Sequence, residues 1–188
     1  MKKSRFYVAL LHYPMYNKRM DIITTSVSNL DLHDISRAAK TYRVERFFVV
    51  HPVASQQQLI REILDYWQQG YGGIYNSDRK EALSIIQIAS DLEEVVRCIE
   101  QERGRKPKLV ATDARHYSGS VAYNQLRQTI RHEDKDLLLL LGTGWGMEEQ
   151  FVAACDYILE PIAFDSTYNH LSVRSAAAII LDRLLSEK

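Results

Sequence analysis

Six short apolar runs recur along the chain and alternate with segments whose apolar residues stand at helical spacing. The runs cover residues 6–10, 47–50, 84–88, 108–112, 137–141 and 157–159. Short runs of this kind are typical of buried strands, whereas apolar residues three or four positions apart indicate one face of a helix. Their alternation predicts an α/β fold: a mainly parallel sheet of about six strands with helices on both faces.

The helical segments carry start and stop signals, and a helix stripe at residues 32–42 is the first of them. The predicted caps and closing glycines are Asp31, Ser55 with Gln58, Asp91 with Glu94, Gly70 and Gly104. Two further helices are expected, at residues 123–130 and from residue 173 onward. The glycine-rich stretch at 70–73 is explained equally well by a turn or by a moving lid.

Length and composition favour one globular domain. The 188 residues are 46% apolar and 26% charged, which excludes a disordered or collagen-like chain. We therefore expect a single domain over residues 1–188. No apolar run approaches the roughly 20 residues of a membrane span, and the stretch at 6–11 is followed by His12 and Pro14 without a cleavage site, so no signal peptide is expected. Two cysteines, Cys98 and Cys155, favour a reducing, cytoplasmic location.

The charge is balanced overall but uneven along the chain. Twenty-four basic residues face 24 acidic ones, a balance that argues against a nucleic-acid partner. Residues 1–20, however, carry five basic residues and no acid, and residues 103–116 carry five basic residues and one acid. Two interpretations follow: these segments are solvated surface, or they line a phosphate-binding face.

The apolar run at 137–141 leads directly into Gly-Thr-Gly-Trp-Gly at 142–146, and residues 147–149 indicate a helix start. Glycines allow a ligand close to the backbone, and amides at a helix N-terminus bind anionic groups. A dinucleotide fingerprint with Glu160 as the ribose acid does not fit, because Met147 replaces the third glycine and only about forty residues follow. The missing Gly-Lys-Ser/Thr excludes a P-loop.

A second candidate segment, at 160–170, is rich in hydrogen-bonding side chains and enters a helix that is apolar almost all round between 176 and 181. Such a helix must be buried on several sides, by its own sheet or by a second subunit. In open α/β sheets the ligand binds beyond the carboxyl ends of the strands. The segments after the predicted strands, 142–147 and 160–170 above all, are therefore the candidate site.

These segments resemble the signature motifs of the SPOUT class of RNA methyltransferases. Residues 140–146, 159–162 and 168–176 resemble its second and third motifs, and residues 29–39 resemble the first motif of its SpoU-like branch. Residues 12–14, 111–115 and 181–184 are also similar to a small, single-domain bacterial branch. The resemblance covers essentially the whole chain.

The resemblance implies a parallel sheet whose C-terminal segment forms a deep trefoil knot, and a homodimer. It also implies methyl transfer from S-adenosyl-L-methionine (SAM) to a tRNA or rRNA nucleotide, at a ribose oxygen or a base nitrogen, without a metal or a membrane. Carried over residue by residue, the implied cofactor-binding positions are Thr112, Leu141, Gly142, Thr143, Gly144, Gly146, Pro161, Ile162, His170, Leu171 and Ser172.

The implied catalytic residues are Arg37, on the acceptor side, and Asn169. A guanidinium can clamp a phosphate or lower the pKa of the acceptor, although Arg37 could also be a polar-face residue paired with Asp34 or Thr41. Asn169 and Asp165 are candidates to orient the acceptor or take its proton.

Some positions depart from the family pattern. His33 and Asp34 replace small residues and a glycine, Ala38 replaces a threonine, and Leu171 with Ser172 stands where asparagine–valine is common. These departures bear on the transferred catalytic roles more than on the fold or the cofactor. Two alternatives stay open beside the enzyme: a SAM- or RNA-binding protein of the same fold without turnover, and a nicotinamide-dependent oxidoreductase built on residues 142–146.

Overall fold

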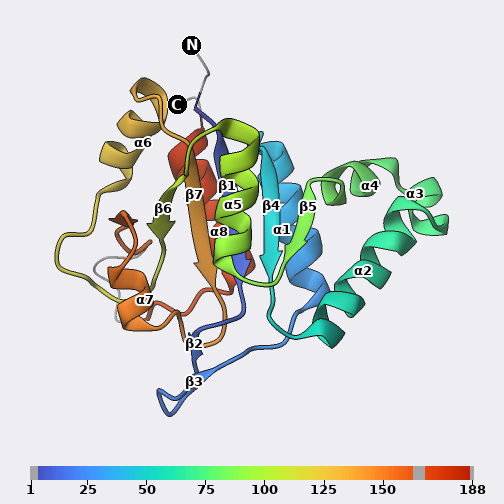
Figure 1. Cartoon of the computed structure of the whole chain (residues 1–188), viewed down its shortest axis with the longest axis horizontal. Coiled ribbons are helices and arrows are strands. Elements are labelled where there is room, and N and C mark those ends of the chain that lie inside the picture. Colours follow the sequence, from blue (N-terminus) through green and yellow to red (C-terminus); the bar gives the residue numbers. More distant parts are fainter. Residues whose placement is uncertain (1–3, 163–167, 187–188) are drawn as a thin grey trace.

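The computed structural model describes residues 4–162 and 168–186. Its main sheet has six parallel strands in the order β5-β4-β1-β7-β6-β8 (Figure 1). They are β1 (Phe6–Leu11), β4 (Arg46–Val50), β5 (Ile86–Ala89), β6 (Lys108–Ala111), β7 (Leu137–Gly142) and β8 (Tyr157–Ile158). A small antiparallel pair, β2 (Met15–Tyr16) and β3 (Ile22–Ile23), follows β1. The α/β fold with about six parallel strands is thus confirmed.

Helices cover both faces of the sheet (Figure 1). They are α1 (Asn29–Thr41), α2 (Ala54–Gln68), α3 (Tyr71–Tyr75), α4 (Ser77–Leu83), α5 (Leu92–Arg103), α6 (Tyr123–His132), α7 (Glu149–Ala153) and α8 (Val173–Leu185). No helix among the described residues is long and apolar enough to cross a membrane.

Two separate cores lie on the two faces because strand side chains alternate in direction. Phe6, Val8 and Leu10 of β1 point into the core shared with α1 and α8, whereas Tyr7 and Ala9 point into the core shared with α5 and α7. Both faces of the central strands are therefore buried, which explains why their sequences are apolar without alternation.

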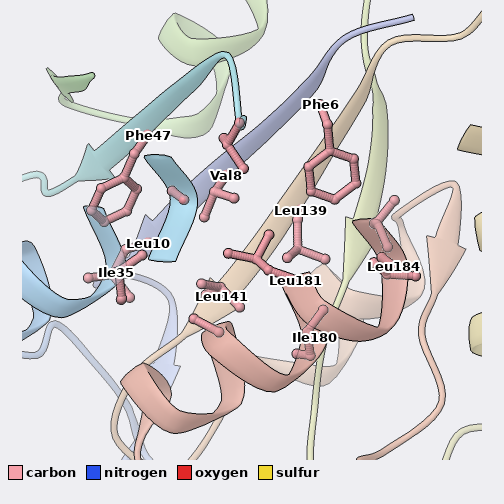
Figure 2. Close-up of a cluster of buried hydrophobic side chains, with 14 of the residues drawn as sticks. Phe6, Val8, Leu10, Ile35, Phe47, Leu139, Leu141, Ile180, Leu181 and Leu184 are labelled. Carbon is pink, nitrogen blue, oxygen red and sulfur yellow. The ribbon is translucent and has the colours of Figure 1, made fainter. Parts of the chain in front are cut away.

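The last helix buries its apolar side mainly within its own chain. Ile180, Leu181 and Leu184 point onto Phe6 and Leu139 of the sheet (Figure 2). Of the two predicted ways to bury this helix, the structure shows the first, its own sheet. Homodimerisation is therefore a prediction that rests on the family resemblance. The predicted knot likewise stays a prediction, since the chain path before α8 includes residues outside the described ones.

Helix ends follow the predicted signals only in part. The carboxylate of Asp91 caps α5 by accepting the N–H of Glu94, and Gly104 closes the helix at a φ of +73°. In contrast, α1 begins at the N-cap Ser28 and α2 at the N-cap Val53. Asp31 and the Ser55–Gln58 pair therefore lie inside helices, and their predicted capping roles are wrong.

The glycine-rich stretch at 70–73 forms the start of α3 rather than only a turn. A Cβ on Gly72 would lie 2.6 Å from the ring of Tyr66, and one on Gly73 would lie 2.3 Å from the carbonyl oxygen of Trp67. Glycine is needed there because α3 sits directly against the end of α2. Tertiary contact thus overrides the low helix propensity of glycine.

A buried carboxylate anchors the amino-terminal edge of the sheet. The side chain of Asp136 is fully buried and accepts hydrogen bonds from Arg103 (3.0 Å), Arg105 (2.7 Å) and the backbone N–H of Arg5 (2.8 Å). Burial alone would raise the pKa of this carboxyl, but the hydrogen bonds from Arg105 and Arg103 hold it well below its ordinary value.

The same contacts correct one interpretation of the charge pattern. Arg103, Arg105 and Lys108 form ion pairs with Asp136 and Asp156. Most of the basic residues in the segment 103–116 are thus neutralised by acids from elsewhere in the chain. This segment does not form a free phosphate-binding face.

We expect Asp136→Asn to lower the free energy of unfolding by about 3 kcal/mol at neutral pH, because it leaves two buried or half-buried guanidiniums without their counter-charge. The contribution requires the ionised carboxylate, whose pKa is depressed by folding. The difference from wild type should therefore be complete above about pH 4 and shrink as the pH falls further. Urea unfolding at several pH values measures it. The control is Asp134→Asn, which removes only an exposed partner of Arg105; an equal loss in both variants would contradict the assignment.

Candidate functional site

A cavity of about 630 Å³ opens at the carboxyl ends of β6 and β7. Three segments surround it: residues 112–115 after β6, residues 142–146 after β7, and residues 169–173 at the start of α8. The volume lies within the roughly 300–1,000 Å³ typical of sites for small molecules and cofactors. Its position is the one where open α/β sheets bind their ligands.

The cavity gathers nearly all of the predicted cofactor-binding positions. Those that line it are Thr112, Leu141, Gly142, Thr143, Gly144, Gly146, Ile162, His170, Leu171 and Ser172. Pro161 is buried and lies outside this lining. Segments separated by about thirty residues in the chain thus meet here because β6 and β7 are neighbours in the sheet.

Glycine is required in the loop 142–146 by the geometry of the loop itself. Gly144 and Gly146 have φ angles of +61° and +96°, which other residues rarely adopt. A Cβ on Gly142 would lie 2.8 Å from Cγ of Met147, and one on Gly144 would lie 3.2 Å from the carbonyl oxygen of Tyr16. The glycines therefore let the loop pack tightly, and this packing brings its backbone to the cavity wall.

The strand pair β2–β3 supports this loop. Tyr16 donates its N–H to the carbonyl of Gly146 (2.9 Å) and accepts the N–H of Trp145 (3.1 Å). The hydroxyl of Thr143 donates to the carbonyl of Leu11 and lies 2.5 Å from the hydroxyl of Thr25. The role of these residues in supporting the loop was not predicted, because they precede the loop by more than 110 positions and no local pattern links them to it.

Two buried histidines bind the backbone of Thr25, which in turn contacts the loop. The rings of His12, after β1, and His51, after β4, lie 4.9 Å apart. Nε2 of His51 lies 2.9 Å from the carbonyl oxygen of Thr25. Burial lowers the pKa of both, that of His12 to about 4 with a further contribution from His51, so both are neutral at pH 7. They connect the central strands to the loop through Thr25.

A charged cluster forms one wall of the cavity. Arg115 binds the carboxylate of Asp113 at 2.6 Å and donates to the backbone carbonyl of Met147. The hydroxyl of Tyr117 also donates to Asp113, at 3.1 Å. Burial, with the negative charge of Asp113, raises the pKa of Tyr117 well above its ordinary value, so the phenol stays protonated. Asp113 is thus satisfied by its own neighbours. The predicted cofactor-binding and catalytic positions do not include these three side chains, although they follow directly after the predicted strand at 108–112.

The start of α8 and the segment before it form the opposite wall. Ser172 caps α8 by accepting the N–H of Ser175 (3.2 Å). The amide of Asn169 donates to the carbonyl of Ala114 at 3.1 Å, which joins this wall to the loop after β6. The ring of His170 contacts the edge of the exposed Trp145 at 6.3 Å between centroids. Asn169 thus lies at the cavity, whereas Asp165 falls outside the described residues.

Glu160 has a structural contact at the cavity. Its carboxylate accepts the backbone N–H of Tyr123 at 3.0 Å, in the first turn of α6. It thereby satisfies an N–H that the helix itself leaves without a partner.

Arg37 lies apart from this cavity. It is exposed on α1 and lines a second groove, between α1 and α2. Neither predicted partner holds its guanidinium: Asp34 binds Arg174 at 3.5 Å, and the hydroxyl of Thr41 donates to the backbone carbonyl of Arg37. Arg37 is thus an exposed residue on the polar face of α1, as one interpretation predicted, but the predicted pairing with Asp34 or Thr41 is wrong.

The cavity has the chemistry of a site for a nucleoside-like ligand with a charged end. Its apolar lining includes Leu141, Ile162 and Ile180, which suit a flat heterocycle. The glycine loop offers backbone groups, and the N-terminus of α8 carries a partial positive charge that favours a carboxylate. Among the described residues, no group of three or more histidine, cysteine or acidic side chains gathers as a metal site.

A family profile described as "SAM-dependent RNA methyltransferase" matches residues 5–186. An uncharacterized protein from Aquifex aeolicus (strain VF5) is 44% identical over 186 residues, covering 99% of this chain and 91% of that protein. A protein from Oleidesulfovibrio alaskensis named tRNA (guanine-N(1)-)-methyltransferase is 40% identical over 181 residues. That match covers 96% of this chain but only 42% of the longer protein.

Solved structures of methyltransferases share the fold. A probable methyltransferase from Bordetella pertussis Tohama I has a TM-score of 0.65 at 16% identity, with 96% of this chain and 94% of that chain covered. The SpoU methyltransferase AviRb from Streptomyces viridochromogenes, in complex with AdoMet, has a TM-score of 0.59 at 18% identity, with 98% and 58% covered.

Proposed function

The chain belongs to the family of SAM-dependent RNA methyltransferases, and we propose that the cavity beyond β6 and β7 is where it binds SAM. One observation carries this assignment: the predicted cofactor positions from three separate segments converge on a single cavity of about 630 Å³. The fold and the cofactor class agree with the resemblance found in the sequence.

The lining fits the three parts of SAM. Leu141, Ile162 and Ile180 offer apolar surface for the adenine, and the loop 142–146 offers backbone groups for its polar edge. The capped N-terminus of α8 suits the carboxylate of the methionine part. When bound, SAM would supply an electrophilic methyl group on its positive sulfonium; transfer to an acceptor oxygen or nitrogen would leave the neutral thioether S-adenosylhomocysteine and release the proton of the acceptor.

The residues of the chain have to orient the acceptor atom and stabilise the charge that develops on it. We assign Arg37 to the acceptor side, where an unpaired guanidinium can hold a phosphate or stabilise a developing negative charge. Asn169, fixed by the carbonyl of Ala114, is assigned to orienting the acceptor. Because Arg37 does not line the cavity of its own chain, the assignment requires a second chain, and we propose a homodimer in which each subunit supplies Arg37 to the cavity of its partner.

The substrate is proposed to be tRNA or rRNA. Two relatives, from Oleidesulfovibrio alaskensis and Nitratidesulfovibrio vulgaris, carry the name tRNA (guanine-N(1)-)-methyltransferase. The chain spans 42% of the length of each, so the named activity belongs to proteins more than twice as long. We therefore propose methyl transfer to RNA and do not assign the guanine N1 position to this chain. We also propose that residues 1–188 act as one methyltransferase domain in the cytoplasm. Mass spectrometry of modified nucleosides in RNA from a deletion strain and its parent identifies the nucleotide.

We expect the purified protein to bind SAM saturably and Gly144→Val to weaken that binding at least about tenfold, because the residue has positive φ and lines the cavity. The matched control is Gly119→Val. Gly119 has a φ of +85° and open space around it, outside the cavity. Calorimetric titration measures both. Absence of SAM binding by the folded wild-type protein, or equal weakening by the two variants, would contradict the cavity assignment.

We expect Arg37→Ala to lower the rate of methyl transfer roughly ten- to a hundred-fold, because one charge-assisted contact is worth about 1.5–3 kcal/mol. SAM affinity and thermal stability should stay close to wild type, since the side chain is exposed and makes no ion pair among the described residues. Transfer of tritiated methyl groups to RNA from the deletion strain is the measurement. A wild-type rate would show that Arg37 has no role on the acceptor side.

The homodimer should have twice the chain mass of 21.7 kDa in light scattering at micromolar concentration. Mixing Arg37→Ala with Gly144→Val protomers should restore methyl transfer, since each mixed dimer then holds one intact cavity facing one intact Arg37. A monomeric mass, or no recovery on mixing, would refute the shared site.

A further inference from the structure

A second groove, here called the α1–α2 groove, has a volume of about 560 Å³ and lies between α1 and α2. His33 and Arg37 contribute from α1, Tyr66 and Trp67 from α2, and Arg79 from α4. Helices α2, α3 and α4 project beyond β5, the edge strand of the sheet farthest from β8 (Figure 1). No described residue lines both this groove and the cavity at β6 and β7.

An ordered cluster of rings and one cation forms the groove wall. The guanidinium of Arg79 lies 4.9 Å from the centre of a Trp67 ring, over its face. The rings of His33 and Tyr66 meet Trp67 edge-on, at 5.2 and 5.4 Å between centroids. Tyr66 is 52% exposed. Trp67 therefore contacts both a planar guanidinium and an accessible aromatic ring within one groove, and nucleobases stack on both kinds of surface.

In the described part of the chain, the two arginines of the groove have no ion pair, whereas one of its two acids has one. Neither Arg37 nor Arg79 forms an ion pair with any residue in the described part of the chain. Of the two acids that line the groove, Asp34 contacts Arg174 at 3.5 Å and Glu62 accepts a hydrogen bond from Gln58 at 3.1 Å. Two guanidiniums that lack ion pairs among the described residues are suited to a phosphate.

Exposed aromatic surface continues from the groove onto α3. Gly72 packs against the ring of Tyr66, where a Cβ would come within 2.6 Å. Beyond it, the rings of Tyr71 and Tyr75 stack at 6.3 Å between centroids and are 68% and 77% exposed. Exposed aromatic residues gathered in this way mark a binding surface.

We propose that the α1–α2 groove binds a nucleotide of a single-stranded segment of the RNA substrate, with a phosphate at Arg37 and Arg79 and the base against the Arg79–Tyr66 surface. The proposal rests on the proposed function, and it places a flanking nucleotide next to the residue assigned to the acceptor side. A protein partner other than a second copy of this chain would need carboxylates of its own for both guanidiniums. RNA supplies the phosphate and the base together.

The test compares Arg79→Gln with Arg61→Gln. Arg61 is an exposed arginine of α2 that does not line the groove. The probe is a fluorescein-labelled single-stranded RNA 12-mer of mixed sequence, and binding is measured by anisotropy at several salt concentrations. Arg79→Gln should weaken binding about tenfold and reduce the slope of log affinity against log salt by about 0.7, the value for one phosphate contact on a single strand. Arg61→Gln should change neither, and SAM affinity and thermal stability should match wild type in both variants.

Cross-linking provides an independent measurement. RNA containing 4-thiouridine, irradiated on the wild-type protein and digested with trypsin, should attach to the peptide of residues 62–79, which carries Tyr66, Trp67, Tyr71 and Tyr75. Cross-links found only on other peptides would overturn the proposal.

The remaining outcomes separate this proposal from the proposed function. If Arg79→Gln binds RNA like wild type while methyl transfer proceeds, the groove is not an RNA site and the methyltransferase function stands. If the variant instead changes the mass in light scattering, the groove is a contact between chains and the proposal is overturned. If the wild-type protein binds SAM but no RNA, both proposals fail.

Discussion

The pairing of β1 with β4 on one side and β7 on the other is the contact on which the molecule depends. Residues 6–11 pair in parallel with residues 46–50 and 137–142, and every side chain of β1 is buried. Parallel strands point their carboxyl ends the same way, so the loops after β1 and β7 emerge together. The hairpin at residues 15–23 can therefore reach the glycine loop and hold it.

The cavity is held by groups whose own hydrogen bonds are already made. Asp113 is satisfied by Arg115 and Tyr117, and Thr143 by Leu11. A site assembled in this way needs little reorganisation when a ligand enters, which is the condition under which positioning contributes most to a transfer reaction. The contacts of Asp113 are local in the chain, whereas Thr143 binds a residue 132 positions earlier.

Ion pairs between α8 and α1 connect a wall of the cavity with a wall of the α1–α2 groove. Arg174, in the first turn of α8, pairs with Asp31 at 3.3 Å and with Asp34 at 3.5 Å on α1. Its neighbour Val173 lines the cavity, and Asp34 lines the groove. The same contact explains why Asp31 is not an N-cap: its carboxylate, inside the helix, faces a cation from α8.

The sequence by itself determined the alternation of strands and helices and the glycine loop, because each depends on residues a few positions apart. The cap at Asp91 was predicted correctly for the same reason. The predicted cofactor segments rest on the family resemblance. Only the tertiary structure decided that Arg37 lies away from the cavity, that the basic segment 103–116 is neutralised, and that residues 71–75 form a helix against Tyr66. These features join residues that are distant in the chain or packed across helices, and side-chain contact of that kind depends on how the crossovers stack the elements.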